Sequence, residues 1–513
     1  MVLCGIKRKF VQNELHMKRV LIFLVAVVAM SVVMAAMDGD GGRSGAAGNE
    51  GRVLPVTGTF INLPYQDVRN RYTNPQDIDC TSPALWYSKV AEMHEMGMEY
   101  LIFMSVANEQ KAYYPSKLME WHYPQWRKSP VDAVMDAAAE YGMKVFMSTG
   151  WAKDQDDNLR DPAIKGRQIE MMEELAAMYG NHPAFHGWYL PVEDCLGPVL
   201  TDYAVEAVNA LTARARELTP SAKILISPYG IFNSDFDDPR YEQQLSRLEV
   251  DIIAYQDEIG CVRERYPLPR LRENWKKLRA IHDRTGVEMW ANCESFAWDK
   301  NTNDRSSALV PASYSRFLAQ QVAASEGGAE KIISFIFCGL VESPSAAVAL
   351  GEQTWSQEFY RDYMDWRAGD RYWKAAELGF RGELRYYDAP ESVRAMASED
   401  PSDEGWTVYG PGTHEIVIEV EGITDEVVVR MLNSRKDGIV PPQKISLYTG
   451  NGPDGDFCLQ QVKYTPVWPH TRHDTFVDIV LFELDDIEDP FIKIVFSTDS
   501  KVFLDKIFDD VRL

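Results

Sequence analysis

One unit recurs from residue 53 to residue 370: a short apolar run, a polar loop and then an amphipathic helix. The apolar runs are rich in β-branched and aromatic residues. They are apolar on both faces, which is typical of strands in a parallel sheet covered by helices on each side. Eight such strands are predicted, over residues 53–63, 100–106, 144–150, 184–192, 223–229, 250–256, 288–294 and 331–338.

Amphipathic helices are expected between these strands. The first, over 83–97, ends at a glycine, and the second, over 130–142, begins at Pro130 and ends at Gly142. Eight strands alternating with helices predict an α/β fold with a closed (β/α)₈ barrel over residues 52–378, and an open sheet of similar content is the alternative. Further helices are predicted over 164–180, 201–218, 270–285, 311–327 and 355–368.

The pattern changes after residue 380, where helical periodicity gives way to short alternating runs separated by turn residues. This alternation is typical of an antiparallel β-sandwich, which we expect over residues 379–513. Trp406, Trp468 and Tyr448 in this domain form either a sugar platform or, as we favour, part of its core. Its strands are predicted over 415–420, 426–432, 443–449, 476–482, 491–497 and 502–508.

The N-terminal residues predict export. Lys18 and Arg19 precede an uncharged apolar run over 20–34, and small residues follow it, so residues 1–36 are interpreted as a short extension plus a signal peptide. The glycine-rich segment 37–51 then reads as a flexible leader. The protein is therefore expected in the periplasm or outside the cell, without stable membrane insertion after cleavage. An uncleaved anchor helix is the alternative.

Charge and missing motifs narrow the function. The formal charge is −24, from 53 basic and 77 acidic residues, and such a balance argues against nucleic-acid partners. The seven cysteines form no C-x-x-C pair, and the chain contains no H-E-x-x-H, Walker or G-x-S-x-G motif and no Rossmann glycine run. We therefore expect neither a metal nor a cofactor. The sequence predicts no oligomeric state.

Two glutamates follow apolar strands directly. Glu193 ends the fourth predicted strand region and Glu294 ends the seventh. The C-terminal ends of barrel strands form the working face, so both side chains are expected at one rim. Glycoside hydrolysis uses two carboxyl groups, one to protonate the leaving oxygen and one to attack or to activate water. The other interpretation is that the two glutamates are strand-end caps or salt-bridge partners.

These positions carry a family resemblance. The stretches Gly187–Glu193, Asp251–Asp257 and Trp290–Glu294 resemble an uncharacterised family of secreted bacterial barrel proteins labelled as candidate glycoside hydrolases, in which a β-rich domain often follows the barrel. The arrangement is also similar to the large retaining clan of barrel glycosidases. That resemblance implies that Glu193 is the acid/base and Glu294 the nucleophile. Val192 stands where many clan members place an asparagine.

Polar and aromatic residues near the predicted strand ends are candidates for binding a glycan. Aromatic rings stack on the C–H faces of sugars, and amide or carboxyl groups bind hydroxyls. The candidate substrate-binding residues are Asn108, Trp151, Tyr229, Gln256, Asp257, Asn292 and Trp298.

The sequence thus predicts a glycoside hydrolase acting on an oligosaccharide or polysaccharide. A non-catalytic glycan-binding protein on the same scaffold is the alternative, and the valine at position 192 favours it modestly. A metal-free lyase or isomerase is compatible with the barrel but has no motif to support it.

Overall fold

The computed structural model describes most of the chain from residue 52 onward. The predicted signal peptide and leader therefore lie outside the described residues, and export remains a prediction. Within the described part, no helix combines the length and the apolar character needed to cross a membrane. The described residues are 52–63, 82–108, 110–121, 128–154, 157–262, 268–298, 309–350, 353–370, 373, 377, 401–402, 405–420, 424–434, 437–453, 455–464 and 475–509.

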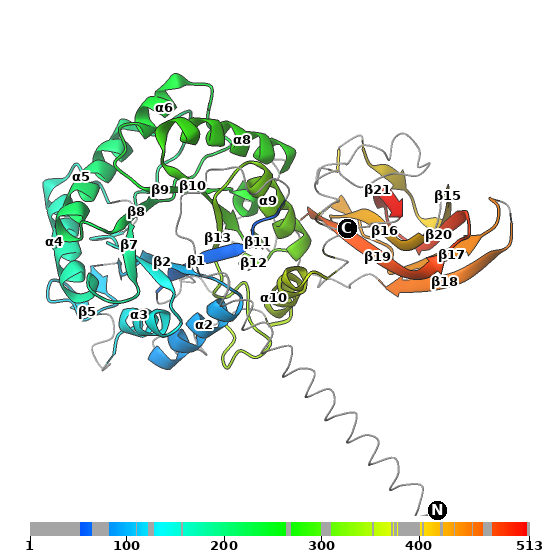
Figure 1. Cartoon of the computed structure of the whole chain (residues 1–513), viewed down its shortest axis with the longest axis horizontal. Coiled ribbons are helices and arrows are strands. Elements are labelled where there is room, and N and C mark those ends of the chain that lie inside the picture. Colours follow the sequence, from blue (N-terminus) through cyan, green and yellow to red (C-terminus); the bar gives the residue numbers. More distant parts are fainter. Residues whose placement is uncertain are drawn as a thin grey trace, which may run out of the picture. The chain divides into compact units, whose positions relative to one another are not determined.

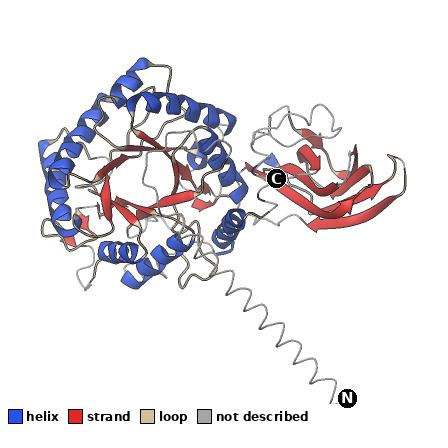
Figure 2. Ribbon diagram, in the orientation of Figure 1, coloured by secondary structure: helices blue, strands red, loops and turns tan. Residues whose placement is uncertain are grey.

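Eight parallel strands close into a barrel in the order β1-β13-β10-β9-β8-β7-β6-β2. The prediction of a (β/α)₈ barrel is confirmed, and each of the eight predicted strands is present. Figure 2 shows the strands as an inner ring and the helices as an outer one. The barrel strands are β1 (Val56–Asn62), β2 (Tyr100–Ser105), β6 (Lys144–Ser148), β7 (Phe185–Tyr189), β8 (Lys223–Ile226), β9 (Ile252–Gln256), β10 (Glu288–Glu294) and β13 (Lys331–Phe335).

Helices cover the outside of the barrel (Figure 1). Several begin at a side-chain cap, which satisfies backbone N–H groups of the first turn: the Ser129 hydroxyl accepts from Asp132 N, and the Thr201 hydroxyl accepts from Ala204 N. The helices are α2 (Pro83–Glu95), α3 (Pro130–Glu140), α4 (Pro162–Tyr179), α5 (Asp202–Leu218), α6 (Pro239–Leu245), α7 (Ile259–Val262), α8 (Leu268–Thr285), α9 (Tyr314–Glu326) and α10 (Gln353–Ala368).

Aromatic side chains fill the barrel interior in layers. Near the N-terminal ends of the strands, the Tyr100 and Trp290 rings lie 5.0 Å apart, and the Phe146 and His186 rings lie 5.1 Å apart. The Phe60 ring lies 5.1 Å from that of Tyr189 and forms part of a further layer. The barrel is therefore a packed core, and a ligand meets it at the mouth.

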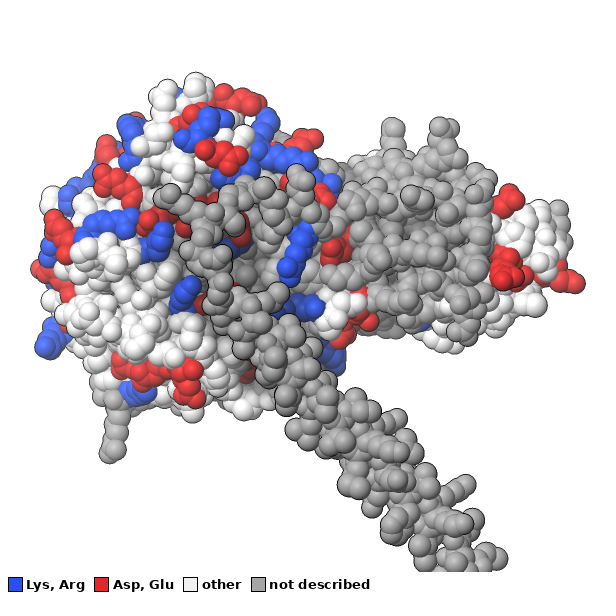
Figure 3. Space-filling view, viewed as in Figure 1, with Lys and Arg blue, Asp and Glu red and all other residues white. Residues whose placement is uncertain are grey.

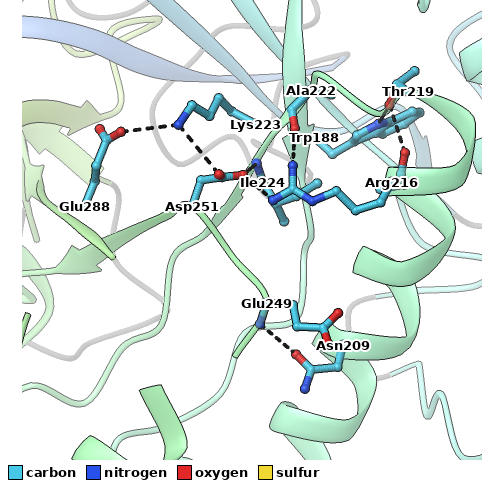
Figure 4. Close-up of polar contacts among 11 residues, drawn as sticks. Trp188, Asn209, Arg216, Thr219, Ala222, Lys223, Ile224, Glu249, Asp251 and Glu288 are labelled. Carbon is cyan, nitrogen blue, oxygen red and sulfur yellow. Dashed lines mark hydrogen bonds and ion pairs between the residues drawn. The ribbon is translucent and has the colours of Figure 1, made fainter. Parts of the chain in front are cut away.

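Ion pairs link the N-terminal ends of β8, β9 and β10 (Figure 4). Asp251 accepts from Arg216 at 2.6 Å and from the backbone N–H of Ile224 at 2.8 Å. Lys223 lies 3.6 Å from both Asp251 and Glu288. These charges neutralise one another at the end of the barrel opposite the mouth.

Short strands accompany the loops at the C-terminal face. β11 (Phe296–Trp298) pairs with β12 (Leu309–Pro311) as an antiparallel hairpin just after β10. A three-stranded sheet follows β2, built from β3 (Ala107–Asn108), β4 (Lys111–Ala112) and β5 (Glu120–Trp121).

The C-terminal residues form two four-stranded antiparallel sheets, in the orders β14-β21-β16-β19 and β15-β20-β17-β18. The predicted β-sandwich is confirmed. Trp406 is buried, whereas Tyr448 is half-buried beneath the Lys493 ammonium, and Trp468 lies outside the described residues. The strands are β14 (Thr407–Tyr409), β15 (Gly412–Glu419), β16 (Thr424–Ser434), β17 (Lys444–Gly450), β18 (Phe457–Tyr464), β19 (Thr475–Ile487), β20 (Phe491–Thr498) and β21 (Val502–Asp509).

Candidate active site

Polar side chains from three strands form the floor of the barrel mouth. The Gln256 side-chain amide donates to the Ser227 carbonyl at 3.0 Å, and Asn292 Nδ2 donates to the Ser227 hydroxyl oxygen at 3.2 Å. Asn292 is 2% exposed, and its Oδ1 has no hydrogen-bond partner among the described residues. The floor thus presents a buried acceptor to which a ligand hydroxyl can donate.

Glu193 lies in the loop after β7 and is exposed to water. Protein atoms nevertheless crowd its carboxyl group, and this crowding raises its pKa, while a hydrogen bond from Gln256 acts in the opposite direction. Its charge also contributes to raising the pKa of Tyr189 and of Tyr229, so both phenols lie near it. Because the side chain remains open to solvent, it can reach a ligand and exchange its proton with water.

Glu294 ends β10 and is only 4% exposed. Its Oε2 accepts from the backbone N–H of Cys261 in α7, at 2.8 Å. A Cβ atom at Gly260 would lie 2.8 Å from the same oxygen, so α7 packs directly against this carboxyl. Burial, followed by the charges of Asp257 and Glu258, raises the pKa of Glu294 to about 8.

Glu193 and Glu294 share the C-terminal rim of the barrel. The strand order is β7-β8-β9-β10, so Gln256 at the end of β9 lies between them. Gln256 is the pairing partner of Asn292, two residues before Glu294, and it lies close enough to Glu193 to oppose the rise of that residue's pKa. The two glutamates therefore lie on either side of the strand end that carries Gln256.

Asp257 was expected to bind substrate, but it does not line the mouth. It is fully buried, and its Oδ2 accepts from the Gln320 side chain on α9 at 2.6 Å. Its Oδ1 accepts from the backbone N–H of Glu294 at 3.1 Å. The side chain points outward because its partners lie on the helix that covers this part of the barrel.

Glu258 is a third carboxyl at this rim and is not among the site residues predicted from the sequence. Its backbone has φ of 54°, which is uncommon for a residue other than glycine, and the residue is 6% exposed. Its Oε2 accepts from the backbone N–H of Gly230 at 2.7 Å. Burial raises the pKa of Glu258 to about 7, opposed by that hydrogen bond.

The remaining candidates divide into exposed and packed residues. Tyr229 is 38% exposed at the rim, and Asn108 is half-buried in β3. Trp151 is 4% exposed and its ring N–H donates to the Pro191 carbonyl at 3.3 Å, so it supports the rim instead of offering a ring face. Trp298 lies in β11, and its side chain is outside the described structure.

The described residues include no group of three or more His, Cys, Asp or Glu side chains placed to hold a metal ion. In Figure 3, acidic and basic side chains are interspersed over the described surface of the barrel. The overall negative charge therefore does not gather into one acidic field on this face.

A family model described as a domain of unknown function, DUF4434, matches residues 56–348. This range contains all eight barrel strands. No curated protein matches the sequence.

Solved structures of low similarity include glycosidases. A candidate α-L-fucosidase from Bacteroides thetaiotaomicron is 19% identical, with a TM-score of 0.48, covering 64% of this chain and 98% of the other. A glycoside hydrolase of family 5 from Bacteroides vulgatus is 11% identical, with a TM-score of 0.38, covering 86% and 89%. A xylanase from Thermoanaerobacterium saccharolyticum is 12% identical, with a TM-score of 0.35, covering 55% and 85%. Likeness at this level says nothing about an activity, which must be argued from the residues.

Proposed function

The chain belongs to the DUF4434 family, whose domain has no assigned function, and we propose that its barrel is a glycoside hydrolase acting through Glu193 and Glu294. One observation carries this proposal: both glutamates lie at the C-terminal rim, on either side of a polar floor that includes the buried acceptor oxygen of Asn292, which is unpaired within the described part of the chain. Paired carboxyl groups of unlike exposure beside a hydroxyl-binding floor suit the cleavage of a glycosidic bond.

We assign the roles from surroundings and from the retaining clan that the chain resembles. Glu193 is open to water, so it can protonate the leaving oxygen and later take a proton from the incoming water. Glu294 is held still by the Cys261 N–H, as suits a nucleophile that attacks the anomeric carbon. A covalent glycosyl intermediate, and hence retention of configuration, follows from this assignment.

The amides of the floor replace the asparagine that many clan members carry before the acid/base. Val192 has no polar side chain and cannot bind a sugar hydroxyl. Asn292 offers a buried acceptor, and Gln256 lies beside Glu193. We propose that these two amides orient the sugar hydroxyls, with Tyr229 as the exposed ring at the rim.

The substrate class follows from this chemistry and from the predicted signal peptide. An exported hydrolase meets glycans in the periplasm or outside the cell. We therefore propose an oligosaccharide or polysaccharide from that compartment as the substrate.

Replacing either glutamate tests the function. We expect Glu193→Gln and Glu294→Gln each to lower kcat/KM on a panel of aryl glycosides by at least about 100-fold, because each removes a proton-transfer or nucleophilic group. Glu288→Gln is the matched control, since Glu288 lies at the other end of the same strand. Full activity in both rim variants would overturn the assignment. Glycan binding without any cleavage by the wild type would favour a binding protein.

The pH profile tests which glutamate attacks. A nucleophile must lose its proton, and the pKa of Glu294 is about 8 in the free protein. We therefore expect kcat/KM, which reports groups of the free enzyme, to rise as the pH increases toward 8. A fall through the same range would assign the acid role to Glu294 instead. Rescue of Glu294→Ala by azide, with formation of a glycosyl azide, gives an independent identification of the nucleophile.

A further inference from the structure

We propose that Asp257 is a positioning residue for Glu294 and that its charge sets the pH range in which Glu294 can act. The inference rests on the proposed hydrolase function. It assigns to Asp257 a role behind the wall of the barrel, in place of the substrate contact that its strand-end position suggests.

Asp257 accepts hydrogen bonds from the backbone around Glu294, at the end of β10. Its Oδ1 accepts from the N–H of Glu294 at 3.1 Å and from the N–H of Ile259 at 3.2 Å. Ile259 begins α7, the helix whose Cys261 N–H donates to the Glu294 carboxyl. One buried carboxyl therefore fixes both the nucleophile's own peptide and the helix that holds its side chain.

Helix α9 adds further hydrogen bonds to Asp257 and to the Glu294 backbone from the outer side of the barrel. Gln320 donates to Asp257 Oδ2 at 2.6 Å and to the Glu294 carbonyl at 3.2 Å. Arg316 donates to the Glu294 carbonyl at 2.8 Å and to the Phe296 carbonyl at 2.8 Å. The Glu294 peptide is thus hydrogen-bonded at both its N–H and its C=O by side chains that are completely or almost completely buried.

The same contacts influence which of the two carboxyl groups, that of Asp257 or that of Glu294, carries a proton. Burial raises the pKa of Asp257, and the three N–H bonds that it accepts oppose this rise by favouring the ionised form. Glu294 beside it feels that charge, and its pKa rises to about 8. The titratable and charged groups facing Glu294 are Asp257 and Glu258 after β9, Cys293 on its own strand, Cys261 on α7 and Arg316 on α9. Of these, Asp257 is the largest charge effect on Glu294.

The structure offers a conservative way to remove the charge. Gln320 Oε1 is buried without a hydrogen-bond partner among the described residues. In Asp257→Asn, rotation of the Gln320 amide brings this oxygen to the new NH₂ group, so the contact to α9 can persist. The double variant Asp257→Asn with Gln320→Glu keeps a hydrogen bond between the two positions and moves the negative charge from the end of β9 to helix α9.

The experiment measures the titration of Glu294 in two ways. One is the low-pH limb of kcat/KM on an aryl glycoside. The other is ¹³C NMR of labelled glutamate carboxyls, with the Glu294 signal identified by its loss in Glu294→Gln. For Asp257→Asn we expect both midpoints to fall by about one pH unit or more, since one unit corresponds to about 1.4 kcal/mol of lost interaction. The double variant should fall between the wild type and Asp257→Asn.

A purely structural role predicts a different result. It would lower kcat, while both midpoints stayed at their wild-type pH, and that outcome overturns the inference. The NMR titration does not need catalysis, so an inactive wild type refutes the proposed function while still testing Asp257. Where Asp257→Asn alone does not fold, the double variant must show the downward shift, and an unchanged midpoint there also overturns the inference.

Discussion

The two glutamates at the rim meet water to very different degrees. Glu193 is exposed, whereas Glu294 is 4% exposed and is surrounded by Asp257 and Glu258. An exposed carboxyl exchanges protons freely, and a buried one keeps a fixed position and a shifted titration. The two residues are of the same type, so their different roles in the proposed hydrolysis depend on this difference in surroundings.

The sequence predicted individual site residues where the strand end alone decides their position. Glu193, Gln256 and Asn292 follow from strand ends and reach the mouth. Glu258 shares the parity of Gln256, but parity alone did not decide its position, because that depends on an unusual backbone angle and on an N–H from the neighbouring loop. Arg316 was not predicted. It lies on α9 and donates to the Glu294 carbonyl at the end of β10, and no short sequence motif indicates a contact between a helix and a strand end.

The buried side chain of His282 leads to a prediction about how the stability of the fold depends on pH. Tyr255 OH lies 2.7 Å from His282 Nε2, and His282 Nδ1 lies 2.8 Å from the Val287 carbonyl oxygen. Burial lowers the pKa of His282 to about 4, below its ordinary value of 6.5. The unfolded chain therefore binds a proton first, and the contribution of the neutral ring, present above pH 6.5, is lost as the pH falls from 6.5 through 4.

We expect His282→Gln to flatten this acid dependence. Between pH 7 and pH 4 the wild type should lose about 2–3 kcal/mol more of its free energy of unfolding than the variant does, as measured by urea denaturation. His94 is exposed, so His94→Gln serves as the control and should keep the wild-type slope. Equal slopes in wild type and His282→Gln would show that the buried ring does not resist protonation.

Short elements decide the details of the site, and they were also the elements that the sequence analysis missed. The eight barrel strands and the seven long helices were predicted because their patterns are long and regular. α6 and α7 have seven and four residues, too few to show a helical period. β18 was missed because it has no buried face: all of its residues are exposed or half-buried, so the alternation of apolar and polar residues is absent. The unpredicted α7 is the element that holds the Glu294 carboxyl.

The close approach of α7 to β10 yields a prediction at the scale of elements. In Gly260→Ala the new methyl group meets the Phe296 carbonyl oxygen at 2.6 Å and the Glu294 carboxyl at 2.8 Å, so the helix must move. We expect kcat to fall by about 10- to 100-fold, since a displacement near 1 Å can have that effect.

Gly166→Ala is the control for this substitution. Gly166 lies within α4, and no neighbouring atom lies within 4 Å of the position that an added Cβ would take. The control should keep its activity and gain slightly in stability, because alanine favours the helix. Unchanged kinetics in Gly260→Ala would show that α7 does not position Glu294.

The whole barrel depends on contacts that join its first and last units. The Lys89 ammonium on α2 lies 3.0 Å from Glu342, after the last barrel strand, and 3.1 Å from Glu92. Lys89 and Glu342 are completely buried. Removing Glu342 from this cluster is costly, because the buried Lys89 ammonium then keeps only one of its two carboxylate partners, Glu92.

Glu342→Gln should therefore destabilise the protein by about 2–3 kcal/mol in chemical denaturation, because Glu92 still compensates the Lys89 charge in part. Glu120→Gln is the control, since Glu120 pairs with Lys111 at 3.9 Å on the surface and its loss should cost less than about 1 kcal/mol. A similar small effect for both variants would mean that the buried pair does not hold the barrel closed.

Glu288 and Glu294 stand at opposite ends of one strand, and that separation bears on how such a protein can change over evolutionary time. Glu288 belongs to the ion pairs at the N-terminal ends of the barrel strands, and Glu294 lies at the C-terminal rim. Mutations in the rim loops can alter which ligand is accepted without weakening the ion pairs at the opposite end of the barrel. Proteins that descend from one ancestor with this scaffold can diverge in ligand specificity while they keep the same ion pairs at the N-terminal end of the barrel. Sequence divergence should therefore be concentrated at the C-terminal rim.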